Sequence, residues 1–252
     1  YHRSDRKSYY SNKSFKKSAI LENLLITKPV RSLSGIVNVS VLTKPYPCPG
    51  KCIFCVGQKM VGAQGRFRRA ALVVAEIKRI LALGFNQINF ADDLFTYRKS
   101  HVQSICREIR QKKLDFSWSA FARVDTVDEW ILDEMKSAGC SFLCFGVESA
   151  NEDILKRIKK RIKLDQVEKA IKLCRIKGIE AFASFILGLP GETQASIEQT
   201  VRFAEKLETY YGFHLLAPFP GTEVREYARE YGLTILTNDW SQYDADSMIV
   251  QG

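Results

Sequence analysis

Three cysteines stand together in one short loop, Cys48-Pro-Gly-Lys-Cys52-Ile-Phe-Cys55. Cysteine thiolates are the usual ligands of a four-iron cluster, normally one per iron. Three such ligands leave one iron open, and an open metal position is where a small molecule binds and reacts. The loop therefore predicts a [4Fe-4S] cluster held by Cys48, Cys52 and Cys55, with chemistry at its fourth iron.

Zinc is the rival metal for this loop. A structural zinc site needs a fourth cysteine or histidine nearby, and the histidines of the chain, His2, His101 and His214, all lie outside it. Ligand count therefore favours the open cluster. A non-catalytic iron–sulfur or zinc protein, used for electron transfer or structure, stays open as the less favoured alternative.

The other cysteines give no sign of a second metal site or of disulfides. The chain has 7 cysteines, and an odd count with three in one loop argues against a disulfide framework. We interpret the remaining four as small buried hydrophobic residues: Cys106, Cys140, Cys144 and Cys174. A reducing cytoplasm is the expected compartment.

Composition indicates an ordinary globular protein that carries excess positive charge. The 252 residues are 46% hydrophobic and 26% charged, without the ~18 successive apolar residues of a membrane span and without an apolar signal-peptide core. Part of the net charge of +10 lies in residues 1–34, and a second basic run, KRIKKRIK, spans residues 156–163. No aromatic residues interleave that run, which favours a solvated helix face over a nucleic-acid surface, although RNA binding stays open.

The hydrophobic pattern predicts six strands, each followed by a helix, which is typical of parallel α/β folds. Six units are too few for a closed eight-stranded barrel, so we expect an open partial (β/α)6 TIM-like barrel. We expect a basic arm at 1–34, the barrel at 35–235 and a C-terminal extension at 236–252. The predicted strands are 35–42, 87–91, 116–121, 141–147, 181–187 and 211–216. A capping box of Thr126 and Glu129 should begin one helix, and a last helix is expected over 222–231.

Unusual polar residues follow the predicted strands. Ligands of parallel α/β sheets bind beyond the carboxyl ends of the strands, so residues at those ends should converge on one mouth. They are the cysteine loop after the first strand, Asp92 and Asp93 after the second, Arg123 after the third, Glu148 after the fourth, 188–192 after the fifth and 218–221 after the sixth.

Together these segments resemble the radical S-adenosylmethionine (radical SAM) enzymes. The loop matches the C-x3-C-x-aromatic-C signature of that family, with Phe54 at the aromatic position. The segments FADD (90–93), ARVDT (122–126), FGVES (145–149), ILGLPGET (186–193) and APFPGTE (217–223) are most similar to the cobalamin-dependent branch. The resemblance covers roughly residues 35–245. It implies that SAM binds the open iron and is cleaved reductively to a 5′-deoxyadenosyl radical, for methyl transfer or another C–H functionalisation.

The same resemblance implies hosts for the amino-acid end of SAM and for its ribose. Asp92 or Asp93 would hold the ammonium group, and Arg123 would pair with the carboxylate. Glu148 would bind the ribose or the amino group. Two structural alternatives stay open: Glu148 as a helix-cap partner, and Arg123 paired only with Asp125.

The adenine ring needs apolar walls and backbone hydrogen bonds. Phe54 fits that need, as does the segment 186–193 with Gly188 and Leu189, which closely resembles the adenine-side motif of the family. Glu192 is expected to favour the start of the following helix rather than to contact SAM.

The reaction itself has two readings within the family. Cobalamin-dependent members carry a cobalamin-binding domain before the barrel, and residues 1–34 are too short for one. Cobalamin would therefore be bound by a region outside this chain, or not used. The elongator-like and methylthiotransferase branches share several of these segments and modify tRNA, which is the alternative. A reducing partner such as flavodoxin or ferredoxin is implied in either case.

Overall fold

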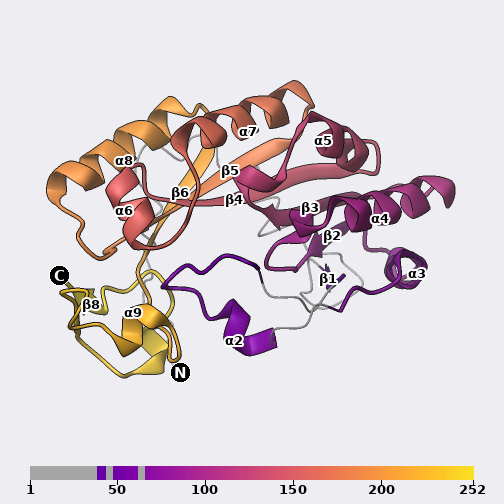
Figure 1. The fold of residues 1–252 in the computed structure, drawn as a ribbon. Coiled ribbons are helices and arrows are strands. Elements are labelled where there is room, and N and C mark those ends of the chain that lie inside the picture. The colour runs from indigo at the N-terminus through magenta and orange to yellow at the C-terminus, as the bar shows by residue number, and fades with distance from the viewer. Residues whose placement is uncertain (1–38, 44–47, 62–65) are drawn as a thin grey trace, which may run out of the picture. The chain divides into compact units, whose positions relative to one another are not determined.

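A sheet of six strands, in the order β1-β2-β3-β4-β5-β6, organises the chain (Figure 1). The computed structural model describes residues 39–43, 48–61 and 66–252. The strands are β1 (Val39–Val41), β2 (Gln87–Phe90), β3 (Ser117–Ala122), β4 (Cys140–Glu148), β5 (Glu180–Leu187) and β6 (Tyr210–Leu215). All neighbours from β2 to β6 are parallel. Within the described residues the sheet ends at β1 and β6 and does not close, which confirms the open α/β class.

Helices connect the strands, as parallel neighbours require. They are α2 (Gly57–Val61), α3 (Ala70–Ala82), α4 (Lys99–Gln111), α5 (Glu129–Lys136), α6 (Glu152–Arg157), α7 (Leu164–Ile176), α8 (Gln194–Lys206) and α9 (Glu223–Glu226). Figure 1 shows α4, α5, α7 and α8 along one face of the sheet, and the cysteine loop with α2 on the other side.

The two faces of the sheet differ because successive side chains of a strand point to opposite sides. The side chains that face the helices are large, apolar and almost fully buried: Phe90, Trp118, Phe145 and Phe185. The alternate positions are smaller or polar and only half-buried: Asn89, Ser119, Cys144 and Ser184. This second face looks toward the cysteine loop, so it can accept a ligand without opening the core.

Two expectations about helix ends are wrong. The N-cap of α5 is Asp128, whose Oδ1 accepts a hydrogen bond from the Ile131 amide at 2.9 Å, whereas Thr126 lies in a 3₁₀ turn at Val124–Thr126. The expected helix over 222–231 is only the short α9. At α5 the side-chain hydrogen bond of Asp128 decides where regular helix begins. At α9 the backbone of Tyr227, with φ −114° and ψ 31°, leaves the helical range and ends the helix.

The basic run is not a solvated helix face. Helix α6 ends at Arg157, and Lys159 and Arg161 adopt left-handed backbone angles, with φ of 58° and 55°. This backbone turns Lys160 inward, where it is 6% exposed.

The four cysteines outside the loop were expected to be small buried residues. Three of them, Cys106, Cys140 and Cys174, are buried, and Cys144 is half-buried.

The chain after α9 returns to the sheet. Strand β7 (Thr234–Ile235) pairs antiparallel with β8 (Val250–Gln251), and the Leu215 amide donates to the Ala245 carbonyl at 2.6 Å. Residues 40–252 form one compact unit. The predicted arm at 1–34 and residues 35–38 of the predicted first strand lie outside the described residues, so the domain boundaries stay a prediction. Among the described helices, none has the length and apolar character needed to span a bilayer.

Candidate functional site

Two of the three sulfur atoms in the cysteine loop lie near backbone amides of the same loop. The Gly50 amide lies 3.4 Å from Cys48 Sγ, and the Gly57 amide lies 3.4 Å from Cys55 Sγ. A Cβ on Gly50 would lie 3.3 Å from Cys48 Sγ and 3.7 Å from Cys52 Sγ. Glycine therefore leaves the space that the two sulfurs share. All seven cysteines are thiols rather than disulfides.

The charges around these thiols act on their ionisation. Burial raises the pKa of Cys52, while the nearby cations of Lys160 and Arg123 oppose that rise. Burial also raises the pKa of Cys55, and the amide of Gly57 opposes it. Metal ligation needs the thiolate form, so both cations and this amide favour ligation. Among the described residues, no three side chains of His, Cys, Asp or Glu are grouped so as to share one metal ion.

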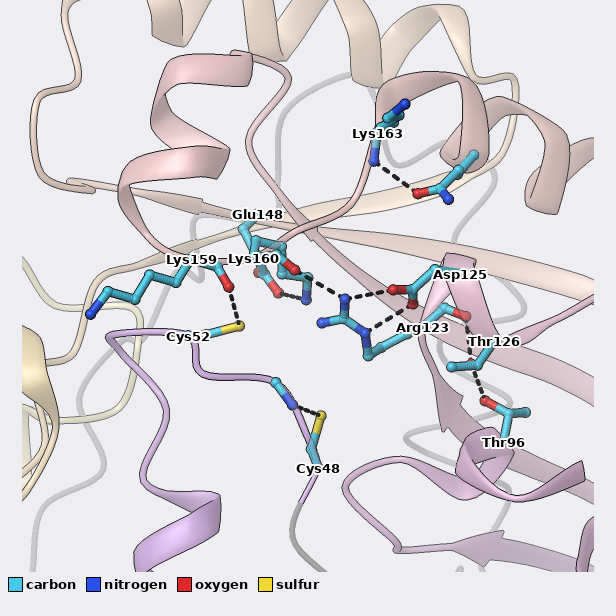
Figure 2. A network of polar contacts seen from close by, with 12 residues as sticks. Cys48, Cys52, Thr96, Arg123, Asp125, Thr126, Glu148, Lys159, Lys160 and Lys163 are labelled. Atoms are coloured by element: carbon cyan, nitrogen blue, oxygen red, sulfur yellow. Dashed lines mark hydrogen bonds and ion pairs between the residues drawn. The ribbon is translucent and has the colours of Figure 1, made fainter.

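Arg123 follows β3 and faces the loop from the side. Its Nε and Nη2 donate to the two carboxylate oxygens of Asp125 at 2.9 and 2.8 Å, and Nη2 also donates to the Lys160 carbonyl at 3.0 Å. Nη1 would lie 3.4 Å from a Cβ on Gly50. Burial alone would lower the pKa of Arg123, but Asp125 raises it overall. The Asp125 pairing therefore exists, and it leaves Nη1 directed at the cysteine loop (Figure 2).

A buried ion pair lies beside the same loop. Lys160 Nζ donates to Glu148 Oε1 at 2.7 Å, and the side chains are 7% and 8% exposed. Glu148 ends β4 with a left-handed φ of 73°, after a register shift between Gly146 and Glu148. Such an outlier costs about 1–3 kcal/mol and is most often kept where it serves a site. A Cβ on Gly146 would lie 2.4 Å from Glu148 Oε1. The glycine at this position therefore leaves the space that the Glu148 carboxylate occupies in the ion pair.

The two aspartates after β2 have different environments. Asp92 is 1% exposed and accepts hydrogen bonds from the amide and hydroxyl of Thr43 at 3.1 and 2.8 Å. Asp93 is exposed, and its Oδ2 would lie 3.1 Å from a Cβ on Gly57. The hydrogen bonds of Asp92 thus link the segment after β2 to the segment after β1, while Asp93 lies beside the last cysteine of the loop.

The segment after β5 is closed by Glu192. Its Oε2 accepts from the amides of Gly188 and Leu189 at 2.6 and 3.0 Å, while Oε1 is buried with no partner among the described groups. Burial raises the pKa of Glu192, and the hydrogen bonds from these two amides oppose that rise. Leu189 is 2% exposed, and Phe54 is half-buried. Glu192 therefore fixes the turn itself, beyond its expected influence on α8.

The structure brings together the cysteine loop, Arg123 and Glu148, as the strand-end argument expects. Lys160 was missed by that argument. The signal in the sequence was the basic run, but which of its lysines turns inward depends on the two left-handed residues that flank Lys160.

Comparison with known proteins agrees with this architecture. The Radical SAM superfamily model matches residues 46–204. A solved radical SAM methyltransferase, TsrM from Kitasatospora setae with cobalamin and a [4Fe-4S] cluster bound, aligns with a TM-score of 0.72 and 26% identity. That alignment covers 80% of this chain and 40% of that one. The chain belongs to the radical SAM superfamily, whose members use a [4Fe-4S] cluster and SAM, and its similarity lies with the cobalamin-dependent branch.

Two curated relatives extend the comparison. An uncharacterized methyltransferase, PH0819 of Pyrococcus horikoshii, is 38% identical over 198 residues, covering 78% of this chain and 43% of the relative. A putative methylthiotransferase, MJ0865 of Methanocaldococcus jannaschii, is 32% identical over 187 residues, covering 70% and 41%. The chain thus spans less than half the length of these relatives. The two relatives carry different activity names, methyltransferase and methylthiotransferase.

Proposed function

We propose that Cys48, Cys52 and Cys55 hold the [4Fe-4S] cluster and that the groups beside them bind SAM. The observation that carries this proposal is the meeting of the three-thiol loop with Arg123 and Lys160, both less than 12% exposed in their side chains. A site that gathers thiols, buried cations and a buried carboxylate has the charges that an anionic cluster and an amino-acid ligand require.

The residues present fit such a cluster. The donor set is three thiols with a backbone amide directed at two of them, and amide–sulfur hydrogen bonds are among the features that set cluster potentials. When bound, the cluster supplies the electron for reductive cleavage of SAM. The protein contributes the thiolates, and Cys52 is half-buried.

The amino-acid end of SAM carries one positive and one negative group. For the ammonium, Asp93 is the better host of the two aspartates, because Asp92 is held by Thr43. For the carboxylate, Arg123 remains a candidate through Nη1, and Lys160 is a second one that the motif resemblance did not include. Glu148 stays a candidate for the ribose or amino group, and its Oε1 is held in place by the ion pair with Lys160.

For the adenine ring, we propose Phe54 and the turn at Gly188 and Leu189. Gly188 has a left-handed φ of 85°, and its amide is engaged by Glu192. The Leu187 and Leu189 carbonyls each accept one backbone hydrogen bond, from Leu216 and Glu192, and a carbonyl can accept a second. The turn therefore offers carbonyl oxygens and the apolar end of β5 rather than amides. A purine amino group donates hydrogen bonds, which suits carbonyl acceptors.

The overall reaction we propose is methyl transfer to carbon with cobalamin bound by a region outside this chain. TsrM, which binds cobalamin, supports this. An electron-transfer protein such as flavodoxin or ferredoxin would reduce the cluster in a reducing cytoplasm. Methylthio transfer, with RNA as a candidate substrate, is the second reading, favoured by the similarity to MJ0865.

The test is anaerobic reconstitution with iron and sulfide, followed by addition of dithionite and SAM. We expect SAM to be consumed with formation of 5′-deoxyadenosine or S-adenosylhomocysteine. Cys52→Ala should abolish consumption, while Cys174→Ala, at a buried position of α7, should retain it. An intact cluster that never consumes SAM would contradict the proposal.

A further inference from the structure

Three segments that are distant in sequence meet at Ile53, the residue directly after Cys52. The Ile53 amide donates to the Ile158 carbonyl at 3.1 Å, and the Val224 amide donates to the Ile53 carbonyl at 3.0 Å. Both backbone groups of Ile53 are thus engaged, one by the chain after α6 and one by the start of α9. Fixing Ile53 also fixes where the chain enters the Cys52–Cys55 turn, in which the Cys55 amide donates to the Cys52 carbonyl at 3.1 Å.

An ion pair joins the two outer segments and completes a ring. Lys159, next to Ile158, donates from Nζ to both oxygens of Glu223 at 2.6 and 2.7 Å. Glu223, next to Val224, also accepts from the Tyr231 hydroxyl at 2.5 Å. The three segments are therefore linked pairwise: the cysteine loop to the chain after α6 and to α9 by backbone hydrogen bonds, and the chain after α6 to α9 by the ion pair.

The interior of this ring is apolar. The side chains of Ile53, Ile158 and Val224 are 1%, 0% and 0% exposed. Water therefore does not compete for the two backbone hydrogen bonds inside the ring, and these are satisfied only while the three segments stay together.

The side chain and carbonyl of Lys159 point in different directions. Figure 2 shows the Lys159 carbonyl directed at Cys52 and the side chain extended away from it; the carbonyl oxygen lies 4.0 Å from Cys52 Sγ. This arrangement depends on the left-handed φ of 58° at Lys159, which is unfavourable for a residue with a Cβ. The Glu223 pair gives the side chain a partner in that conformation.

We propose that the Lys159–Glu223 ion pair, with Tyr231, is a clamp that holds the cysteine loop in the form that retains its cluster. These are positioning residues, since their side chains act through Ile53 and through the Lys159 backbone beside Cys52, and touch no reacting group. The inference rests on the proposed function, because it assumes that Cys52 and Cys55 are cluster ligands. The pair is about 40% exposed on the lysine side, so it should contribute little to global stability while limiting local opening of the loop.

The matched control is a second exposed ion pair far from the loop in sequence. Lys206 Nζ donates to Glu168 Oε1 at 2.9 Å between α8 and α7, with side chains 74% and 46% exposed. The test variants are Lys159→Met, Glu223→Gln and the double variant. The controls are Lys206→Met and Glu168→Gln, and Lys159→Arg tests rescue.

The first readout is the rate at which the reconstituted protein loses iron to a chelator under anaerobic conditions. We expect loss about two- to fivefold faster in each clamp variant, no further acceleration in the double variant, recovery in Lys159→Arg, and wild-type rates in the controls. The electron paramagnetic resonance signal of the reduced cluster should broaden in the clamp variants alone, at an unchanged melting temperature. Wild-type rates in the clamp variants, or equal acceleration in the controls, would overturn the inference.

The second readout separates the clamp from the proposed function. In the metal-free protein, hydrogen exchange of the peptide containing Ile53 should be faster in Lys159→Met than in wild type or Lys206→Met. A wild-type protein that takes up no cluster would contradict the proposed function, whereas unchanged exchange at Ile53 would contradict the clamp itself.

Discussion

Replacing Lys160 with methionine should remove the ability of the protein to distinguish SAM from decarboxylated SAM. Lys160 Nζ has three donors, and among the described residues Glu148 Oε1 is the acceptor that it meets. Burial alone would lower the pKa of Lys160, but Glu148 and Cys52 raise it overall, so the ammonium stays charged. It can therefore give a second hydrogen bond to a ligand carboxylate.

The magnitude follows from burial. At 7% exposure the pair is little screened by salt, and a hydrogen bond between charged groups contributes about 1.5–3 kcal/mol. Taking about 2 kcal/mol, wild type should bind SAM about 30-fold more tightly than decarboxylated SAM. Anaerobic titration calorimetry on the reconstituted protein measures both constants. In Lys160→Met the ratio should fall close to one.

Two further variants keep this experiment interpretable. Lys160→Met leaves the Glu148 carboxylate buried without its partner, which is destabilising, so the double variant Glu148→Gln/Lys160→Met removes both charges and should show the same loss of discrimination. Lys163→Met removes one charge from the same basic run at an exposed position, away from the Cys52–Arg123–Lys160 group (Figure 2). It should keep the wild-type ratio. If Lys160→Met weakens both ligands equally, Lys160 has a structural role only and the reasoning fails.

Three other predictions concern the framework of the site. Gly146→Ala would place a Cβ 2.4 Å from Glu148 Oε1 and 2.9 Å from Lys160 Nζ, so we expect a loss of about 1–3 kcal/mol in unfolding free energy and weaker SAM binding; unchanged denaturant melts would contradict this. Asp92→Asn should lower stability by about 1–2 kcal/mol, because it weakens the acceptor for Thr43, whereas Asp93→Asn should leave stability unchanged and weaken SAM binding; the reverse pattern would reverse their assignments. Hydrogen bonds from Lys159 and then Tyr231 lower the pKa of Glu223 from its ordinary value of 4.5. Its contribution to stability is therefore present above that ordinary value and is lost as pH falls through the lowered pKa. Glu223→Gln should reduce the fall in unfolding free energy over this acid range by less than about 1 kcal/mol, and an unchanged pH dependence would argue against the pair.

The fold could be predicted from the sequence because its signals are local and repeated. Each strand is a short apolar run and each helix has an apolar face, so the six βα units and their parallel order follow from periodicity and connection rules. The ends of elements were harder. Asp128 and Thr126 are both acceptable cap residues, and only the backbone angle of Asp128, extended at φ −142°, decides between them.

The residues of the site could be predicted from the sequence where they lie at the ends of strands. Strand ends place Arg123 and Glu148 at the mouth with the cysteines, but they carry no information on partners that come from elsewhere in the chain. Asp92 could be separated from Asp93 only by knowing that Thr43 reaches it across 49 positions of sequence. Lys160 was hidden because a run of eight positions with six basic residues gives no hint of which residue is buried. The left-handed turns on either side supply that information.

The most direct test of the central claim is Mössbauer spectroscopy of the reconstituted protein, with and without SAM. If three cysteines ligate a [4Fe-4S] cluster and the fourth iron is open to SAM, then SAM should change the parameters of one iron and leave those of the other three unchanged. A protein that takes up zinc in place of iron, or a cluster whose spectrum SAM leaves unchanged, would contradict it.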